Sequence, residues 1–334
     1  MPLRTGKLPP EVLQSLVLSH LGRRRPEVLV HASLGEDCSV IDFGEWVGVL
    51  STDPITGAVA NAGWLAVHVS CNDVAACGAE PVGVLPTLLL PEGTTEADIR
   101  RTMAQINAAA QELGVEVLGG HTEVTPGLAN SIISLTAVGK ARRAEYVTSA
   151  GARPGDDIVM SKWAGLEGTA ILATDLGDRL AGRVDEALLA EARQLIDRIS
   201  VVKEGLAAAR HGATALHDAT EGGVLGALYE MAQASGVGLE VQPAVIPLLP
   251  STREICRALG ADPLRLIASG TMLMAAPPQA KLAQVLAREG VPASTIGRAL
   301  PLEAGLWLVA ADGRRSSLQP PERDELWRVL EMLA

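Results

Sequence analysis

The sequence predicts a protein of two α/β (or α+β) domains. Its 334 residues exceed the usual length of one domain, so two domains of about 150 residues are the default expectation. Strand and helix signals alternate along the chain, which favours sheets covered by helices. The polar, Gly- and Pro-containing stretch RRAEYVTSAGARPGD marks a boundary. We therefore expect an N-terminal domain at 1–145 and a C-terminal domain at 150–334.

The first half contains strand and helix signals in a regular order. The segments PEVLVHASL and EWVGVLSTD predict strands, and residues 62–77 predict a helix that is apolar on nearly every face and therefore buried. Gly78 and Pro81 end this helix. After the strand PVGVLPTLLL, Thr95 caps a helix with apolar residues every three or four positions. The strands VEVLGG and SIISLTAVGKA complete this half.

The second half begins with the strand DIVMSK and the glycine-bounded turn WAGLEG. Helices are expected near 166–176, 186–198 and 201–211. The strand ATALHDAT and the helix GGVLGALYEMAQASG follow. A short helix PSTREICRALG, a strand TMLMAAPP and a final helix PERDELWRVLEMLA complete the pattern.

The composition describes a globular protein with an aliphatic core. Hydrophobic residues make up 48% of the chain and aromatic residues only 2%. The formal net charge of −11 disfavours nucleic acid as a partner. No apolar run approaches the ~18 residues of a membrane span, and the N-terminus lacks the apolar segment of a secretion signal. We therefore expect a cytoplasmic protein that binds neither membranes nor nucleic acid.

Four polar clusters lie at the ends of predicted elements in the first half: LGEDCSVID, LSTDPITG, CNDVAACGAEP and GGHTEV. An Asp after a strand is often a turn former. Asp73, however, lies within the apolar helix, where an ionised carboxylate is costly unless it is paired, hydrogen-bonded or bound to metal. Asp73 either belongs to a helix-pinning network with Asn72 and Ser70 or is held for a cation. The acids of the four clusters suit Mg²⁺, which binds through carboxylates and phosphate oxygens: Asp37, Asp53, Asp73 and Glu123.

Histidine and cysteine give weaker signals. His121 either acts as an acid or base near neutral pH or only hydrogen-bonds a neighbouring group. The histidines His31, His121 and His217 follow no zinc-site spacing. The four cysteines form no CxxC pair, so we expect reduced core residues.

Two glycine-rich helix starts occur in the second half. In LHDATEGGVLGALYEMA, Asp218 ends a strand, and the Gly222-Gly223 turn opens a helix whose N–H groups could bind phosphate. In SKWAGLEGTA, Lys162 lies near a similar turn. Neither is a Walker A motif, because GxxxxGK[ST] occurs nowhere in the sequence. An ordinary tight connection is the alternative for both.

Taken in order, the motifs GED…ID, STDP, NDxAxxGAxP and GGxTE resemble the N-terminal domain of the aminoimidazole ribonucleotide (AIR) synthase, or PurM/HypE, superfamily. This superfamily includes the hydrogenase maturation protein HypE, thiamine monophosphate kinase and selenophosphate synthetase. The segments RPGDDIVMSKWAGLEGTAILA and HDATEGGVLGALYEMAQASGVGLEV are similar to its C-terminal domain. The resemblance covers nearly the whole chain and is strongest to HypE-like AIR synthase-related proteins.

The resemblance implies a two-domain fold whose N-terminal domains pair in a homodimer, where their strands form a β-barrel. It implies that ATP and Mg²⁺ bind near that interface. ATP would phosphorylate or activate an amide- or acid-type oxygen of a small molecule or a partner protein. Metal and phosphates would be bound by Asp37, Asp53 and Asp73, and catalysis would involve Asp73, His121 and Glu123. Nucleotide and phosphate contacts would come from Asn72, Gly119, Gly120, Thr122, Lys162, Asp218, Gly222 and Gly223.

The sequence also departs from the HypE pattern. HypE carries the carbamoyl group that it dehydrates on a C-terminal cysteine, whereas this sequence ends RVLEMLA, so we do not expect that reaction on its own tail. His121 stands where HypE has an acid. Two other functions stay open beside the HypE-like enzyme, and the missing C-terminal cysteine is the main support for the first. One is a catalytically silent nucleotide-binding maturation partner or regulator, and the other is AIR synthase or thiamine monophosphate kinase activity.

Overall fold

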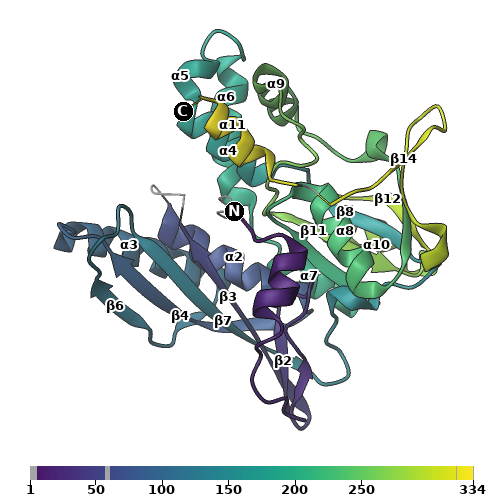
Figure 1. Ribbon diagram of the computed structural model, residues 1–334, viewed down its shortest axis with the longest axis horizontal. Coiled ribbons are helices and arrows are strands. Elements are labelled where there is room, and N and C mark those ends of the chain that lie inside the picture. The colour runs from purple at the N-terminus through teal and green to yellow at the C-terminus, as the bar shows by residue number, and fades with distance from the viewer. Residues whose placement is uncertain (1–5, 57–60, 321, 334) are drawn as a thin grey trace.

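The protein contains two mixed β-sheets, each built from one half of the sequence (Figure 1). The computed structural model describes residues 6–56, 61–320 and 322–333. The N-terminal sheet takes its strands from residues 28–142, and the C-terminal sheet from residues 157–317. The predicted two-domain α/β fold is confirmed. The domain bounds themselves stay a prediction.

The N-terminal sheet is open in the single chain, so it does not form the predicted barrel by itself. Its strands are, in spatial order, β1 (Val28–Val30), β2 (Ser39–Phe43), β3 (Trp46–Ile55), β7 (Ile132–Arg142), β4 (Glu80–Leu90) and β5 (Glu116–Val117). A further strand, β6 (His121–Val124), pairs in parallel with β4. The long antiparallel pairing of β3 with β7 forms the centre of this sheet.

Two helices cover one face of this sheet, namely α2 (Ala62–Ala76) and α3 (Glu96–Leu113). Every residue of α2 except Ala62 and Trp64 is buried, which confirms the predicted buried helix. Thr95 caps α3 in a reciprocal capping box with Asp98, as the sequence predicted. The opposite face carries half-exposed side chains and no helix from the described part of the chain.

The C-terminal sheet has helices on both faces. Its strand order is β14 (Arg315–Ser317), β13 (Leu306–Val309), β10 (Gly238–Val241), β12 (Ala293–Leu300), β8 (Asp157–Ser161), β11 (Thr271–Ala276) and β9 (Ala215–Ala219). Helix α8 (Gly223–Ser235) packs on one face. Helices α7 (Val202–Arg210) and α10 (Leu282–Arg288) pack on the other.

A group of helices lies beside this sheet and contains α4 (Leu166–Asp175), α5 (Gly177–Leu180), α6 (Glu186–Arg193), α9 (Pro250–Leu259) and α11 (Glu325–Leu333) (Figure 1). They share an apolar cluster that includes Leu172, Leu189 and Ile255. The helix expected at 186–198 is divided, because a 3₁₀ segment follows α6 at Gln194–Arg198. The sequence analysis did not predict α1 (Pro10–Val12), which continues as a π-helical segment (Leu13–Val17) and buries no residue.

Helix α2 joins the two halves because it also packs against α7. Gly205 of α7 makes this contact possible: a Cβ atom at this position would lie 2.3 Å from the carbonyl oxygen of Ala75. A separation of that size is far inside van der Waals contact, so the two helix backbones can approach only where α7 has no side chain.

We predict that Gly205→Ala destabilises the protein by about 1–3 kcal/mol, because the methyl group would push α7 away from α2. An exposed helical Gly→Ala change normally stabilises by up to about 1 kcal/mol. Gly177→Ala is the matched control, since its methyl group would meet only the flexible guanidinium of Arg193. Denaturant unfolding measures both variants. Equal stabilisation by the two substitutions would contradict the close α2–α7 contact.

Candidate functional site

A cavity of about 620 Å³ lies between the two halves of the chain and is lined mainly by acidic and hydroxyl side chains. The N-terminal segment, the loop before β2, strand β3, helix α2 and the turn after β9 all contribute to it. Of the described residues that line it, Lys7 is the only Lys or Arg. The acids that line it are Glu36, Asp37, Asp53, Asp73, Glu167, Asp218 and Glu221.

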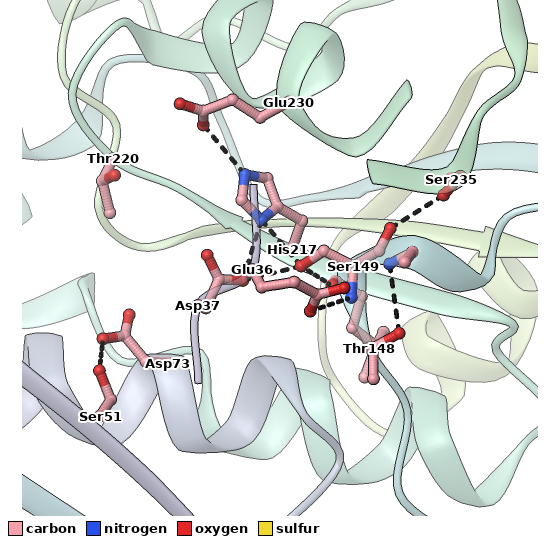
Figure 2. Close-up of polar contacts among 12 residues, drawn as sticks. Glu36, Asp37, Ser51, Asp73, Thr148, Ser149, His217, Thr220, Glu230 and Ser235 are labelled. Atoms are coloured by element: carbon pink, nitrogen blue, oxygen red, sulfur yellow. Dashed lines mark hydrogen bonds and ion pairs between the residues drawn. The ribbon is translucent and has the colours of Figure 1, made fainter. Parts of the chain in front are cut away.

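Asp73 reaches this cavity from the buried helix α2. Its side chain is 6% exposed, and its carboxylate accepts a hydrogen bond from the hydroxyl of Ser51 on β3 (Figure 2). Burial raises the pKa of Asp73 well above its usual range, and the neighbouring carboxylates of Asp218, Asp53 and Asp37 raise it further. So many acids close together are stable only with bound protons or a bound cation.

A second cluster joins the two halves through a buried histidine (Figure 2). His217 on β9 is 3% exposed, and it donates from Nδ1 to Asp37 at 2.9 Å and from Nε2 to Glu230 of α8 at 3.1 Å. Burial alone would lower the pKa of His217, but the two carboxylates outweigh it and raise the pKa well above its usual value. His217 is therefore a cation at neutral pH that fixes the position of Asp37.

The sequence analysis did not include His217 among the site residues. One feature of the sequence could have indicated His217 as a site residue: it directly precedes Asp218 at the end of a predicted strand. A strand places neighbouring side chains on opposite faces. His217 therefore points to α8 while Asp218 lines the cavity.

Ser149 holds the GED loop in place (Figure 2). Its hydroxyl donates to Asp37 Oδ2 at 3.1 Å, and its backbone N–H donates to Glu36 Oε2 at 3.3 Å. Ser235 of α8 donates to the Ser149 carbonyl oxygen at 2.9 Å. The loop that carries Asp37 is thus bonded to Ser149 and to His217 on β9 of the C-terminal sheet.

Asp218 and Glu167 each leave one buried oxygen without a hydrogen-bond partner. Both side chains are almost fully buried, at 2% and 6% exposure. Burial raises the pKa of each to about 7. A buried oxygen without a partner normally indicates a missing ligand or ion. Among the described residues, no three His, Cys, Asp or Glu side chains are arranged closely enough to hold a metal by themselves.

Lys7 places one positive charge beside the turn after β9. Its Nζ donates to Thr220 Oγ1 at 3.2 Å, and its backbone N–H donates to Glu221 Oε1 at 3.1 Å. Although desolvation opposes its charge, the carboxylates of Glu230 and Glu221 raise the pKa of Lys7. The sequence analysis gave no reason to select this residue.

The structure does not place Asn72 in the cavity, contrary to the expected nucleotide contact. Asn72 is fully buried, with its Nδ2 donating to the Ile199 carbonyl oxygen at 2.8 Å and its Oδ1 accepting from the Val201 N–H at 2.8 Å. It therefore ties α2 to the segment before α7. The helix-pinning alternative thus describes Asn72, whereas Asp73 lines the cavity.

The glycine-rich turns of the second half are likewise occupied by contacts within the chain. Gly222 donates to Asp324 Oδ2 at 2.6 Å, and Gly223 donates to the Thr220 carbonyl oxygen at 3.0 Å. These N–H groups are therefore not free for phosphate. Lys162 also lies outside the cavity: its Nζ is 2.7 Å from Glu204 Oε1 and donates to two backbone carbonyls before α7.

The GGHTEV segment lies at the edge of the N-terminal sheet, away from the cavity of its own chain (Figure 1). Its last four residues form strand β6 (His121–Val124), and all four side chains of this strand are exposed. A Cβ at Gly120 would lie 2.1 Å from the Pro86 carbonyl oxygen on β4, which explains the second glycine. His121 Nε2 lies 3.1 Å from Glu123 Oε2. Within one chain, Gly119, Gly120, His121, Thr122 and Glu123 do not join the acidic cavity.

The two-domain fold agrees with the comparisons to known protein families. The model described as AIR synthase related protein, N-terminal domain, matches residues 35–141, and the corresponding C-terminal domain matches residues 153–304. The chain therefore belongs to the AIR synthase-related family, as its motifs indicated. No helix in the described part of the chain is long and apolar enough to cross a lipid bilayer.

Among its relatives, the chain is 29% identical to a hydrogenase expression/formation protein of Methanocaldococcus jannaschii over 93% of both chains. It is 31% identical to the carbamoyl dehydratase HypE of Rhodobacter capsulatus, over 75% of this chain and 74% of the relative. A crystal structure of the hydrogenase maturation protein HypE in complex with ATP aligns with a TM-score of 0.69 and 26% identity, over 95% of each chain.

We predict that Glu167 makes the folded state less stable as the pH rises. Its pKa rises from 4.5 to about 7 on folding, so its stabilising contribution is complete below about pH 4.5 and is lost as the pH passes 7. Glu167→Gln should remove up to about 3 kcal/mol of this pH dependence between pH 5 and 8. Denaturant unfolding at both pH values measures it, with the exposed Glu303→Gln as control. An unchanged pH slope in Glu167→Gln would contradict the prediction.

Proposed function

We propose that this protein is a Mg²⁺-dependent enzyme that uses ATP to phosphorylate or activate an amide- or acid-type oxygen of an acceptor. The observation that carries this proposal is the convergence of Asp37, Asp53, Asp73 and Asp218 on one cavity between the two halves. Phosphoryl transfer depends mainly on positioning the reacting groups and on neutralising the charge of the phosphates. Metal ions held by fixed carboxylates can do both.

The donor set fits a hard cation bound together with phosphate oxygens. Asp218 has an unpartnered buried oxygen, and the pKa of Asp73 is raised by burial and by three neighbouring acids. Mg²⁺ usually binds through one or two protein carboxylates and completes its shell with phosphates and water. When bound, it would neutralise phosphate charge and draw these acids into their ionised forms. A site shared with phosphates does not require three protein ligands, and no such group of three occurs among the described residues.

The other side chains of the cavity keep the acids in fixed positions. The His217 cation orients Asp37, and the Ser51 hydroxyl orients Asp73. Lys7 supplies a cation beside Thr220, where it would favour an anionic ligand. Each of these groups is in place before any ligand binds, and such preorganisation is what electrostatic catalysis requires.

We place the acceptor on another molecule. All four cysteines are buried. Cys38 lines the cavity, but burial raises the pKa of its thiol well above the usual value, which keeps it in the unreactive thiol form. The acceptor would therefore be a small molecule or a group on a partner protein. The names of the relatives, which include a carbamoyl dehydratase and a hydrogenase expression/formation protein, favour a carboxamide on a maturation partner.

We predict that the protein forms ADP from ATP only with Mg²⁺, and that Asp73→Asn lowers kcat by about 100-fold or more. Asn has the shape of Asp without the charge that holds the cation. ADP release in a coupled assay measures the effect, with the exposed Asp312→Asn as control. ATP binding without turnover would instead favour the silent regulator, and the absence of ATP binding would contradict both functions.

We also propose that the protein is a homodimer formed through the open face of the N-terminal sheet. This face presents half-buried apolar side chains of β4 and β7, including Leu85, Leu89, Ile132 and Val138. Apolar side chains on an uncovered sheet face favour association with another surface. Because β6 lies outside the cavity of its own chain, the predicted roles of His121, Thr122 and Glu123 require a second copy.

We predict that Leu89→Lys produces a monomer, because it places a charge within the proposed interface. Size-exclusion chromatography with light scattering measures the mass of both proteins. Arg298→Glu, on the C-terminal sheet, serves as a control for a charge change elsewhere on the surface. A wild-type monomer, or a Leu89→Lys dimer, would contradict this interface.

A further inference from the structure

We propose that Glu167, which lines the cavity beside Ser269, is the acid–base residue that exchanges a proton with the acceptor. This proposal rests on the proposed function and assigns a role to a residue of the same cavity. Glu167 belongs to the WAGLEG turn, for which the sequence offered only a glycine-rich helix start near Lys162.

The local packing puts Glu167 in the cavity wall. Glu167 is the second residue of α4, which begins after Gly165 in a left-handed conformation. Gly168 lets the segment that contains Leu266 pack closely against α4. A Cβ atom at position 168 would lie 2.4 Å from Leu266 Cγ. Glu167 and Ser269 therefore line the same cavity.

One oxygen of Glu167 is buried and unpaired. Glu167 Oε2 has no hydrogen-bond partner among the described residues, although the side chain is only 6% exposed. Ser269 lies beside the carboxyl group in the same cavity wall and opposes the rise of its pKa. Oε2 is therefore the oxygen that can carry or accept a proton. An unpaired carboxyl oxygen in a cavity wall is available to a ligand as a general acid or base.

The charges around Glu167 separate it from the cation-binding acids. The pKa of Asp73 is raised first by burial and then by Asp218, Asp53 and Asp37. Glu167 is also affected mainly by burial, but the acids that act on it are Asp324 and Glu221 from the C-terminal half, while Ser269 opposes the shift. We assign the acids around Asp73 to metal and phosphates, and Glu167 with Ser269 in the same cavity to the acceptor.

The proposed step conserves atoms and charge. The amide oxygen of the acceptor forms a bond to the terminal phosphorus of ATP, and the bond from that phosphorus to the ADP oxygen breaks. The acceptor loses one proton from its amide nitrogen to Oε2 of the ionised Glu167. A pKa of about 7 leaves enough of the ionised form near neutral pH to accept this proton.

The test compares wild type with Glu167→Gln and Glu167→Asp, using Mg²⁺, ATP and S-carbamoyl-cysteine as a small carboxamide probe. ADP formation is followed across the pH range in which the group titrates. Asp175→Asn is the matched control, because Asp175 lies on the same helix and burial also raises its pKa, but it does not line the cavity.

We expect Glu167→Gln to lower kcat by about 100-fold or more and to abolish the limb of the pH profile near 7, with little change in KM for ATP. Glu167→Asp should keep a titrating limb with a reduced kcat. A purely structural role would change stability without removing that limb. A wild-type kcat and pH profile in Glu167→Gln would overturn the proposal.

A second measurement separates this proposal from the function on which it rests. If the wild type forms no ADP, the proposed function fails. Calorimetry then measures the binding of the same probe in the presence of Mg²⁺ and a non-hydrolysable ATP analogue. Repeating the titration in two buffers of different ionisation enthalpy gives the number of protons exchanged on binding. Proton exchange near pH 7 that disappears in Glu167→Gln supports the acid–base assignment. No probe binding, or equal proton counts, overturns it.

Discussion

The burial of helix α2 on all sides is the constraint on which the rest of the structure depends. One face of α2 packs on the N-terminal sheet, and other faces meet α3 and α7. Its polar residues are therefore held at the junction of the two halves. Asn72 binds the backbone before α7, and Asp73 is directed into the cavity. Because this helix leaves no face for water, the carboxyl group of Asp73 is fixed in position and its ionised form is costly without a bound cation.

The electrostatics of the cavity follow from this arrangement. Asp37, Asp53, Asp73 and Asp218 come from separate elements, yet they lie near enough to affect one another. The His217 cation offsets part of this repulsion for Asp37 and Glu230, but it leaves the charge at Asp73 uncompensated. A divalent cation with phosphate would complete the balance. Together with burial, the same repulsion raises the pKa of Asp73 and of Asp218, so these two acids favour their protonated forms without a ligand.

Much of the fold followed from periodicity, because apolar spacing and capping residues are local properties. The buried helix α2 and the Thr95-capped helix α3 are examples. The acids at strand ends could also be predicted as a group. What sequence reasoning missed depends on contacts between distant residues, such as the pairing of His217 with Asp37 and the position of Lys7. It also misplaced residues whose partners are remote: Asn72 binds the segment before α7, and Gly222 binds Asp324.

The most direct measurement is a crystal structure with Mg²⁺ and a non-hydrolysable ATP analogue. We predict that the triphosphate lies in the cavity between the two halves, and that the metal would be held there by carboxylates among Asp37, Asp53, Asp73 and Asp218. It also predicts that Glu167 lies on the side of the terminal phosphate away from the adenosine. A triphosphate bound outside this cavity, with these carboxylates uninvolved, would contradict the central claim.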